Sequence, residues 1–261
     1  MTLDHIGAYQ VISYNSGIND CLRIIGRIAA PLFLFIVVEG LRHTHSMQKY
    51  ILRLYVAGII IEIFNQLIAR ATGVFDFGNT LPTFFYVAYF VFCLEKIKDN
   101  RSNIKEIIMA FCGIAVPFLL VPLYVKLSEN GLSAIKTILS IFVPSPFTVE
   151  YSIIFVLLGM LWYFIDNKYI NCAVFAVISL ICLVIPASSF FTIPLPRFLS
   201  PAYCNVFGMF VSSQWLMCLS IPFMLLYNGE RGRDMRWFFY IYYPVHAYLL
   251  FAISQIEDIF L

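Results

Sequence analysis

The sequence predicts an all-helical, polytopic membrane protein with about eight transmembrane helices and a short or truncated helix at its N-terminus. Of its 261 residues, 61% are hydrophobic and 12% are charged, whereas soluble domains are about 45–50% apolar and about 25% charged. A soluble domain of this length has no interior large enough for so much apolar surface. The bilayer is therefore the expected solvent.

The expected spans are apolar runs long enough to cross a hydrocarbon core of roughly 30 Å as helices. The runs cover residues 22–41, 50–69, 80–97, 105–127, 149–166, 170–190, 204–227 and 236–258. They are continuous rather than alternating, which favours helices over barrel strands. Because the chain has no internal repeat and no separate soluble segment, we expect residues 1–261 to form a single transmembrane domain.

Two connecting segments are longer than a simple turn. Residues 128–148 can form a re-entrant or interfacial helix, because an apolar stretch there lies between polar ends. Residues 186–203 contain four prolines, which exclude a continuous helix. Both segments can cover a cavity or serve as plain connectors.

The distribution of basic residues predicts the orientation. Eleven Lys and Arg residues fall in one set of alternate loops and four in the other. The positive-inside rule places the richer set in the cytoplasm. We therefore expect an integral protein of the cytoplasmic (inner) membrane, in contact with membrane lipids and with its basic loops cytoplasmic. The net charge of +2 comes from short clusters, which argues against a nucleic-acid partner.

Several standard sites are absent from the sequence. The seven cysteines are scattered without a C-x-x-C pair, so we expect neither a metal site nor disulfides. The sequence also lacks the P-loop, H-E-x-x-H and G-x-S-x-G motifs. This argues against a standard ATP-driven pump, zinc protease or serine hydrolase.

Ionisable residues inside or beside membrane spans mark function by default, and this chain groups them in three places. The candidates are Asp4 and His5; then Arg27, Glu39, Arg42, His43, His45, Lys49 and Arg53; and finally Arg231, Arg233, Tyr243 and His246. In the second expected span, Glu62, Asn65 and Gln66 share one helical face, which is expected to face the protein interior.

Two of these groups allow a functional and a plain structural interpretation. Glu39 and His43 are four residues apart and share a helical face, so the carboxylate can make the imidazole a better base. The same pattern is typical of a helix end at the lipid interface. His246 follows Arg236 by ten residues, which places it roughly 15 Å into the membrane. There it can bond a neighbouring helix or line a cavity.

Four segments resemble the TraX family of membrane proteins. Residues 22–33 (LRIIGRIAAPLF) and 39–54 (EGLRHTHSMQKYILRL) are similar to consecutive family motifs. Residues 2–7 (TLDHIG) resemble the family's first-helix element, and residues 237–246 (WFFYIYYPVH) resemble its closing element. Ala30 stands where the family favours an aromatic residue. Family members also usually have further turns of apolar helix before the Asp-His pair.

The resemblance implies a membrane-embedded acetyltransferase that takes its acetyl group from acetyl-CoA. Name-giving members acetylate the N-terminus of conjugative pilins; here the expected acceptor is an amine or hydroxyl of a peptide or small molecule. His5, oriented by Asp4, is the first candidate base, and His43 beside Glu39 is the second. Arg27 is expected to stabilise the oxyanion or to anchor Asp4.

The remaining candidates are assigned by the same resemblance. The groups expected to hold the CoA phosphates are Arg42, His45, Lys49, Arg53, Arg231 and Arg233. Tyr243 and His246 are expected to line the central cavity. Since both chain ends carry candidates, the first and last spans are expected to pack together. The alternatives are a transporter or flippase of a small peptide or lipid, and a non-catalytic scaffold.

Overall fold

The computed structural model describes residues 1–9, 16–73, 78–99, 103–184, 203–206, 209–230, 232 and 236–260. These residues form two compact units. The first unit contains both ends of the chain, and the second runs from Ile36 to Asp166. The expected single domain over residues 1–261 remains a prediction.

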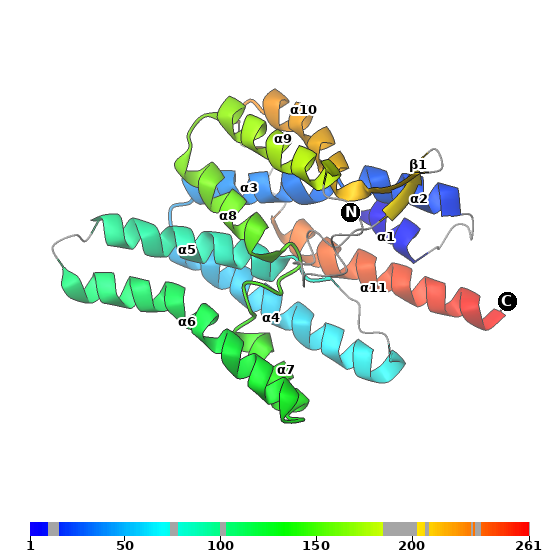
Figure 1. Cartoon of the computed structure of the whole chain (residues 1–261), viewed down its shortest axis with the longest axis horizontal. Coiled ribbons are helices and arrows are strands. Elements are labelled where there is room, and N and C mark those ends of the chain that lie inside the picture. The colour runs from blue at the N-terminus through cyan, green and yellow to red at the C-terminus, as the bar shows by residue number, and fades with distance from the viewer. Residues whose placement is uncertain are drawn as a thin grey trace. The chain divides into compact units, whose positions relative to one another are not determined.

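Helices make up nearly all of the described structure (Figure 1). The first unit contains α1 (Thr2–Ala8), α2 (Ser16–Gly26), the start of α3 (Ala29–His43), α9 (Lys168–Val184), η2 (Ser213–Ser220), α10 (Ile221–Leu226) and α11 (Arg236–Phe260). The second unit contains the rest of α3, α4 (Met47–Thr72), α5 (Leu81–Asp99), α6 (Ile104–Glu129), α7 (Ser133–Phe142) and α8 (Ser152–Phe164). The predicted helical class is confirmed.

Within the described residues, three helical segments are long and apolar enough to cross a membrane: residues 17–43, 47–72 and 104–129. The predicted count of eight spans is therefore not confirmed. Each of the other expected runs contains helix, but within the described residues several of these helices are shorter, including the 13 residues of α8 and the 17 of α9. Large apolar side chains are exposed along α4 and α6, as lipid-facing helices require.

The expected span at 204–227 is wrong as a continuous helix. Its first part forms an antiparallel hairpin of β1 (Tyr203–Val206) and β2 (Met209–Ser212). Aromatic and β-branched residues such as Tyr203, Val206 and Val211 favour strands. The chain becomes helical only at Ser213. The expected helix within 128–148 is present as α7, whereas the expected break at 186–202 lies outside the described residues.

Local sequence signals explain where the helices begin and end. The side chain of Ser46 accepts a hydrogen bond from the Lys49 amide and caps α4, which ends at Gly73 with φ 75°. Asn103 caps α6 in the same way. Pro31 separates α2 from α3, because its ring would clash with the carbonyl of Arg27 in a continuous helix.

The core of the second unit is built around α5, which packs against α4, α6 and α8 (Figure 1). The middle of α5 is almost fully buried, and so is the facing part of α8, including Phe155 and Trp162. In the first unit, α1 packs against both α2 and α11, and α9 packs against η2 and α10. Each unit therefore has a packed interior of its own.

Candidate functional site

Two glycines allow α1 to lie directly on α2 in the first unit. A Cβ at Gly26 would lie 2.3 Å from the Cβ of Asp4, and a Cβ at Gly7 would lie 2.7 Å from the carbonyl oxygen of Asn19. Any other residue at either position would push the two helices apart. This close contact fixes Asp4 and His5 against α2.

His246 on α11 is buried, with 5% of its surface exposed. Its Nδ1 lies 2.6 Å from the carbonyl oxygen of Tyr242, one turn earlier, and the Tyr242 ring stacks on the imidazole at 4.9 Å. A carbonyl oxygen only accepts, so Nδ1 carries the proton and Nε2 keeps a lone pair. Nε2 is buried and has no hydrogen-bond partner among the described residues.

The structure brings the two ends of the chain together at this imidazole. The His5 ring lies 5.2 Å from the His246 ring, and the hydroxyls of Thr2 and Tyr242 are 2.5 Å apart. The Tyr9 ring stacks on His5 and contacts Phe251. The two ends of the chain therefore meet as α1 against α11, whereas the packing of the first expected span, residues 22–41, against the last stays a prediction.

His5 is held in its neutral form. It lies on α1, which has seven residues and is too short to span a membrane. Burial lowers the pKa of His5 to about 4, while the Asp4 charge opposes this shift and His246 adds to it. A neutral imidazole at physiological pH is the form that accepts a proton.

Three further charged side chains of this unit have buried polar atoms without partners. Oδ1 of Asp4 and the Nε atoms of Arg23 and Arg27 make no hydrogen bond among the described residues. Buried polar atoms are normally satisfied. Nε2 of His246 belongs to the same set. Within the described chain, most of the ionisable side chains that have a buried polar atom without a hydrogen-bond partner therefore lie in the first unit.

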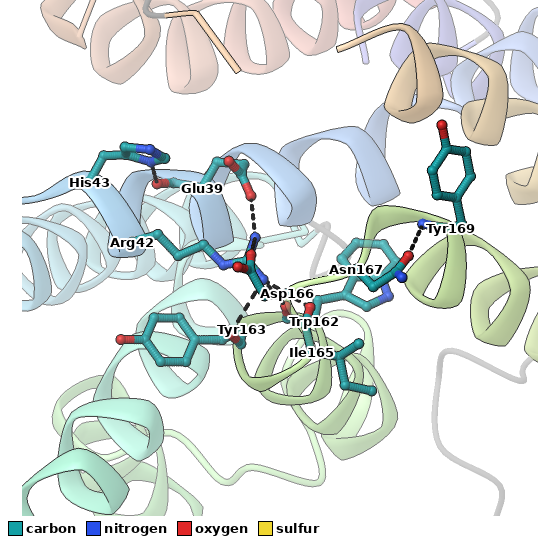
Figure 2. Close-up of polar contacts among 9 residues, drawn as sticks. All are labelled: Glu39, Arg42, His43, Trp162, Tyr163, Ile165, Asp166, Asn167 and Tyr169. Carbon is teal, nitrogen blue, oxygen red and sulfur yellow. Dashed lines mark hydrogen bonds and ion pairs between the residues drawn. The ribbon is translucent and has the colours of Figure 1, made fainter. Parts of the chain in front are cut away.

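The second cluster is centred on Arg42 (Figure 2). Its guanidinium donates to the Glu39 carboxylate at 2.8 Å and to the carbonyl oxygens of Trp162, Tyr163 and Ile165 at 2.6, 3.3 and 3.0 Å. It also lies 3.4 Å from the exposed carboxylate of Asp166. These carbonyls at the end of α8 have no intrahelical partner, so Arg42 acts as their cap. A CoA phosphate would have to replace those contacts.

The expected pairing of the Glu39 carboxylate with His43 is not found. Nδ1 of His43 lies 2.9 Å from the backbone carbonyl of Glu39, and the Glu39 carboxylate faces Arg42 instead (Figure 2). The carbonyl still fixes the tautomer, which leaves Nε2 of His43 as the acceptor. The side chain of His43 is exposed, so solvent competes for that nitrogen.

The other candidates predicted from the sequence do not form one site in the described structure. His45 and Lys49 are exposed beside the start of α4, and the Arg53 guanidinium lies 5.7 Å from the centre of the Tyr50 ring. Tyr243 lies edge-on to His246 at 6.4 Å. Arg231 and Arg233 lie outside the described residues.

The sequence interpretation missed Tyr242 and Thr2 as neighbours of the imidazole pair. Tyr242 precedes His246 by four residues, which is the spacing of helical neighbours, so this pair could have been found. Thr2 gives no such signal, because its contact with Tyr242 joins residues 240 apart in the chain.

Comparison with known proteins gives a family and one curated relative. A family model described as TraX protein matches residues 1–254. A protein of Dichelobacter nodosus named "Probable fimbrial assembly protein FimC, serogroup H1" is 42% identical over 64 residues. That match covers 24% of this chain and 26% of the relative, so it spans about a quarter of each. No solved structure matches the chain.

Proposed function

We propose that this chain, which belongs to the TraX family, moves an acetyl group from cytoplasmic acetyl-CoA to an amine or hydroxyl group of a peptide or other membrane-associated acceptor. The fimbrial name of the Dichelobacter nodosus relative supports a peptide acceptor of the pilin kind. The proposed location is the cytoplasmic membrane, with the basic loops on the cytoplasmic side.

The observation that carries this proposal is the imidazole pair of His5 and His246. Acetyl transfer from a thioester needs a general base that removes a proton from the attacking amine or hydroxyl. Nε2 of His246 has a lone pair, is buried and has no partner among the described residues. His5 lies beside it with a pKa near 4. Nε2 of His246 is thus the nitrogen that is available to a substrate proton.

The proposed reaction has two steps. The base takes the acceptor's proton as the acceptor attacks the thioester carbonyl, and the resulting oxyanion is stabilised by the Arg27 guanidinium. When the tetrahedral intermediate collapses, the C–S bond breaks and the imidazolium returns the proton to the departing CoA thiolate. Asp4 packs on Gly26, the residue before Arg27, and its negative charge favours the transient imidazolium.

The CoA phosphates are assigned to the basic residues at the start of α4. His45 and Lys49 are exposed there, and Arg53 follows one turn later with its Nε buried and without a partner among the described residues. Such groups bind phosphate by charge-assisted hydrogen bonds. Arg42 is a weaker candidate, because it already caps α8.

The test is acetyl-CoA binding and CoA release by the purified full-length chain in detergent or nanodiscs. The chain has four histidines, so single variants can separate the candidate bases. We expect His246→Gln or His5→Gln to lower CoA release at least about 100-fold, the usual contribution of a general base. His43→Gln should change it little, and Lys126→Ala, an exposed residue far along α6, serves as the control.

Two results would contradict the proposal. If His43→Gln is the only variant that loses CoA release, the general base is His43 in the second cluster and not His5 or His246. Absence of binding at millimolar acetyl-CoA would remove the enzyme assignment and favour a transporter or flippase.

A further inference from the structure

Arg23 on α2 is a charged side chain that the proposed reaction does not use. The side chain is partly exposed, and its Nε is buried without a hydrogen-bond partner among the described residues. Residues 17–43 form a segment that is long and apolar enough to cross a membrane. Ionisable side chains inside such a segment are costly and mark function by default. Arg23 therefore calls for a partner that the described chain does not contain.

The stem of Arg23 is held between α1 and α2. A Cβ at Gly7 would lie 3.0 Å from Cγ of Arg23 and 3.1 Å from Cβ of Leu22. A glycine at this position leaves room for the aliphatic part of the arginine under α1. Because the stem is packed, less conformational entropy is lost when the guanidinium binds a ligand.

No carboxylate of the described residues pairs with Arg23. Helix α2 packs against α1 and β1. The carboxylate of α1 belongs to Asp4, which lies against Gly26 further along α2, and β1 has no charged residue. Asp20 precedes Arg23 by three residues, but the ion pairs found within the described chain include neither of them. The guanidinium thus keeps its donors for a ligand.

Arg23 lies close to the residues that carry the proposed reaction. Arg27, which is assigned to the oxyanion, follows one turn later on the same side of α2, so the two side chains begin roughly 5–6 Å apart. Asp4 packs between them on Gly26. The residues assigned to the CoA phosphates follow the other end of the segment 17–43. Arg23 is therefore on the part of this segment that is left for the acceptor.

We propose that Arg23 binds a carboxylate of the acceptor and makes the site selective for an acidic acceptor, namely a peptide with Asp or Glu beside its reacting amine. A planar guanidinium matches a carboxylate through two parallel hydrogen bonds. A phosphate monoester carries up to two charges and is matched better by several cationic groups, such as those at the start of α4. This inference rests on the proposed acetyl transfer and names the class of its acceptor.

The test compares two tetrapeptide amides that differ only at their second residue, which is glutamate in one and glutamine in the other. Equilibrium dialysis measures their binding to the full-length chain in phosphatidylcholine nanodiscs without acetyl-CoA. CoA release with acetyl-CoA present gives the KM of each peptide. We expect the glutamate peptide to bind at least about tenfold more tightly, since its carboxylate adds a charge-assisted pair of hydrogen bonds.

Three variants locate this preference. Arg23→Gln should weaken binding of the glutamate peptide and raise its KM at least about tenfold, so that the two peptides become equal. Arg23→Lys keeps the positive charge without the planar fork and should retain part of the preference, which excludes unfolding as the cause of the loss. Arg70→Gln changes an exposed arginine near the end of α4; it is the matched control and should keep the full preference.

The inference and the proposed function fail in different ways. If CoA is released but the two peptides bind alike, or if Arg23→Gln weakens both equally, the carboxylate site is overturned and acetyl transfer stands. If the glutamate peptide binds through Arg23 but no CoA is released, acetyl transfer is overturned and the carboxylate site stands. If neither peptide binds, the inference is overturned; an anionic phospholipid that native mass spectrometry finds on the wild type and not on Arg23→Gln would then be the ligand.

Discussion

Arg42 shows how one side chain can join distant parts of a membrane-protein unit. Its guanidinium satisfies three carbonyl oxygens at the end of α8 and pairs with Glu39 (Figure 2). The side chains of Arg42 and Glu39 are 21% and 15% exposed, so water replaces these bonds poorly. Asp166, which is 95% exposed, adds little.

Substitution of Arg42 should therefore destabilise the fold strongly. We expect Arg42→Ala to lower the free energy of unfolding by about 2–4 kcal/mol, because it leaves buried carbonyls and the Glu39 carboxylate without a donor. The measurement is chemical unfolding in detergent, followed by tryptophan fluorescence. Glu39→Gln keeps the Arg42 cap and should cost clearly less; equal losses in both variants would contradict a capping role for Arg42.

The burial of His5 gives the protein a specific sensitivity to acid. Its pKa is about 4 in the folded protein and about 6.5 in an unfolded chain. Between these values the unfolded chain binds more protons, so stability rises with pH there. The stability contributed by neutral His5 should accordingly be lost as the pH falls from about 6.5 towards 4.

Thermal unfolding measured across that pH range tests this expectation. The Tm of the wild type should fall more steeply than that of His5→Gln, which cannot gain the proton. His45→Gln removes an exposed imidazole and should follow the wild-type curve. Parallel curves for the wild type and His5→Gln would show that His5 is not buried as described.

At the scale of the elements, three tyrosines from three helices fasten the segment after α7. The hydroxyls of Tyr55 on α4, Tyr124 on α6 and Tyr86 on α5 bond the consecutive carbonyls of Phe142, Val143 and Pro144, the first two at 2.9 and 2.5 Å. A helix end leaves such carbonyls without partners. The tyrosines supply the missing donors and hold this segment against a cavity of about 230 Å³ in the second unit.

Removing these hydroxyls should loosen the segment without changing the helices. We expect Tyr55→Phe, Tyr86→Phe and Tyr124→Phe each to cost about 0.5–1.5 kcal/mol of unfolding free energy. Since they hold neighbouring carbonyls, their effects should not be additive. Chemical unfolding of the single and triple variants measures this. Tyr169→Phe, which changes an exposed tyrosine, is the control. If the triple variant is as stable as this control, the three tyrosine hydrogen bonds do not stabilise the segment after α7.

At the scale of the whole molecule, the apolar faces of α4 and α6 and the distribution of basic residues make a topology prediction. Large apolar side chains such as Leu52, Phe111 and Leu119 are exposed, which suits contact with lipid and not with water. The richer set of Lys and Arg residues is expected in the cytoplasm.

Reporter fusions on either side of α6 test this orientation. A fusion after Asp99 should give fluorescent GFP and inactive alkaline phosphatase, because that loop is expected in the cytoplasm. A fusion after Asn130 should give the opposite result, since residues 104–129 are long enough to cross the membrane. The same reporter signal at both positions would show that α6 does not cross.

Short-range features of this protein were determined by the sequence alone. Continuous apolar runs predict helices because every backbone group in lipid must be satisfied within its own segment. The face of Glu62, Asn65 and Gln66 was correctly expected to turn inward: Asn65 is buried, and Glu62 and Gln66 line the cavity. Within the described chain, His5 and His246 were also predicted as candidates, because they are ionisable residues inside or beside apolar segments.

What only the tertiary structure decided is which distant groups meet. The contact between His5 and His246, the capping of α8 by Arg42, and the approach of Asn79 to Glu62 join residues from different elements. Periodicity describes the faces of one helix but contains no information on which helix covers each face. Helix packing selects the partners, which is why the α8 carbonyls capped by Arg42 and the cavity with Glu150 became visible only in the folded chain.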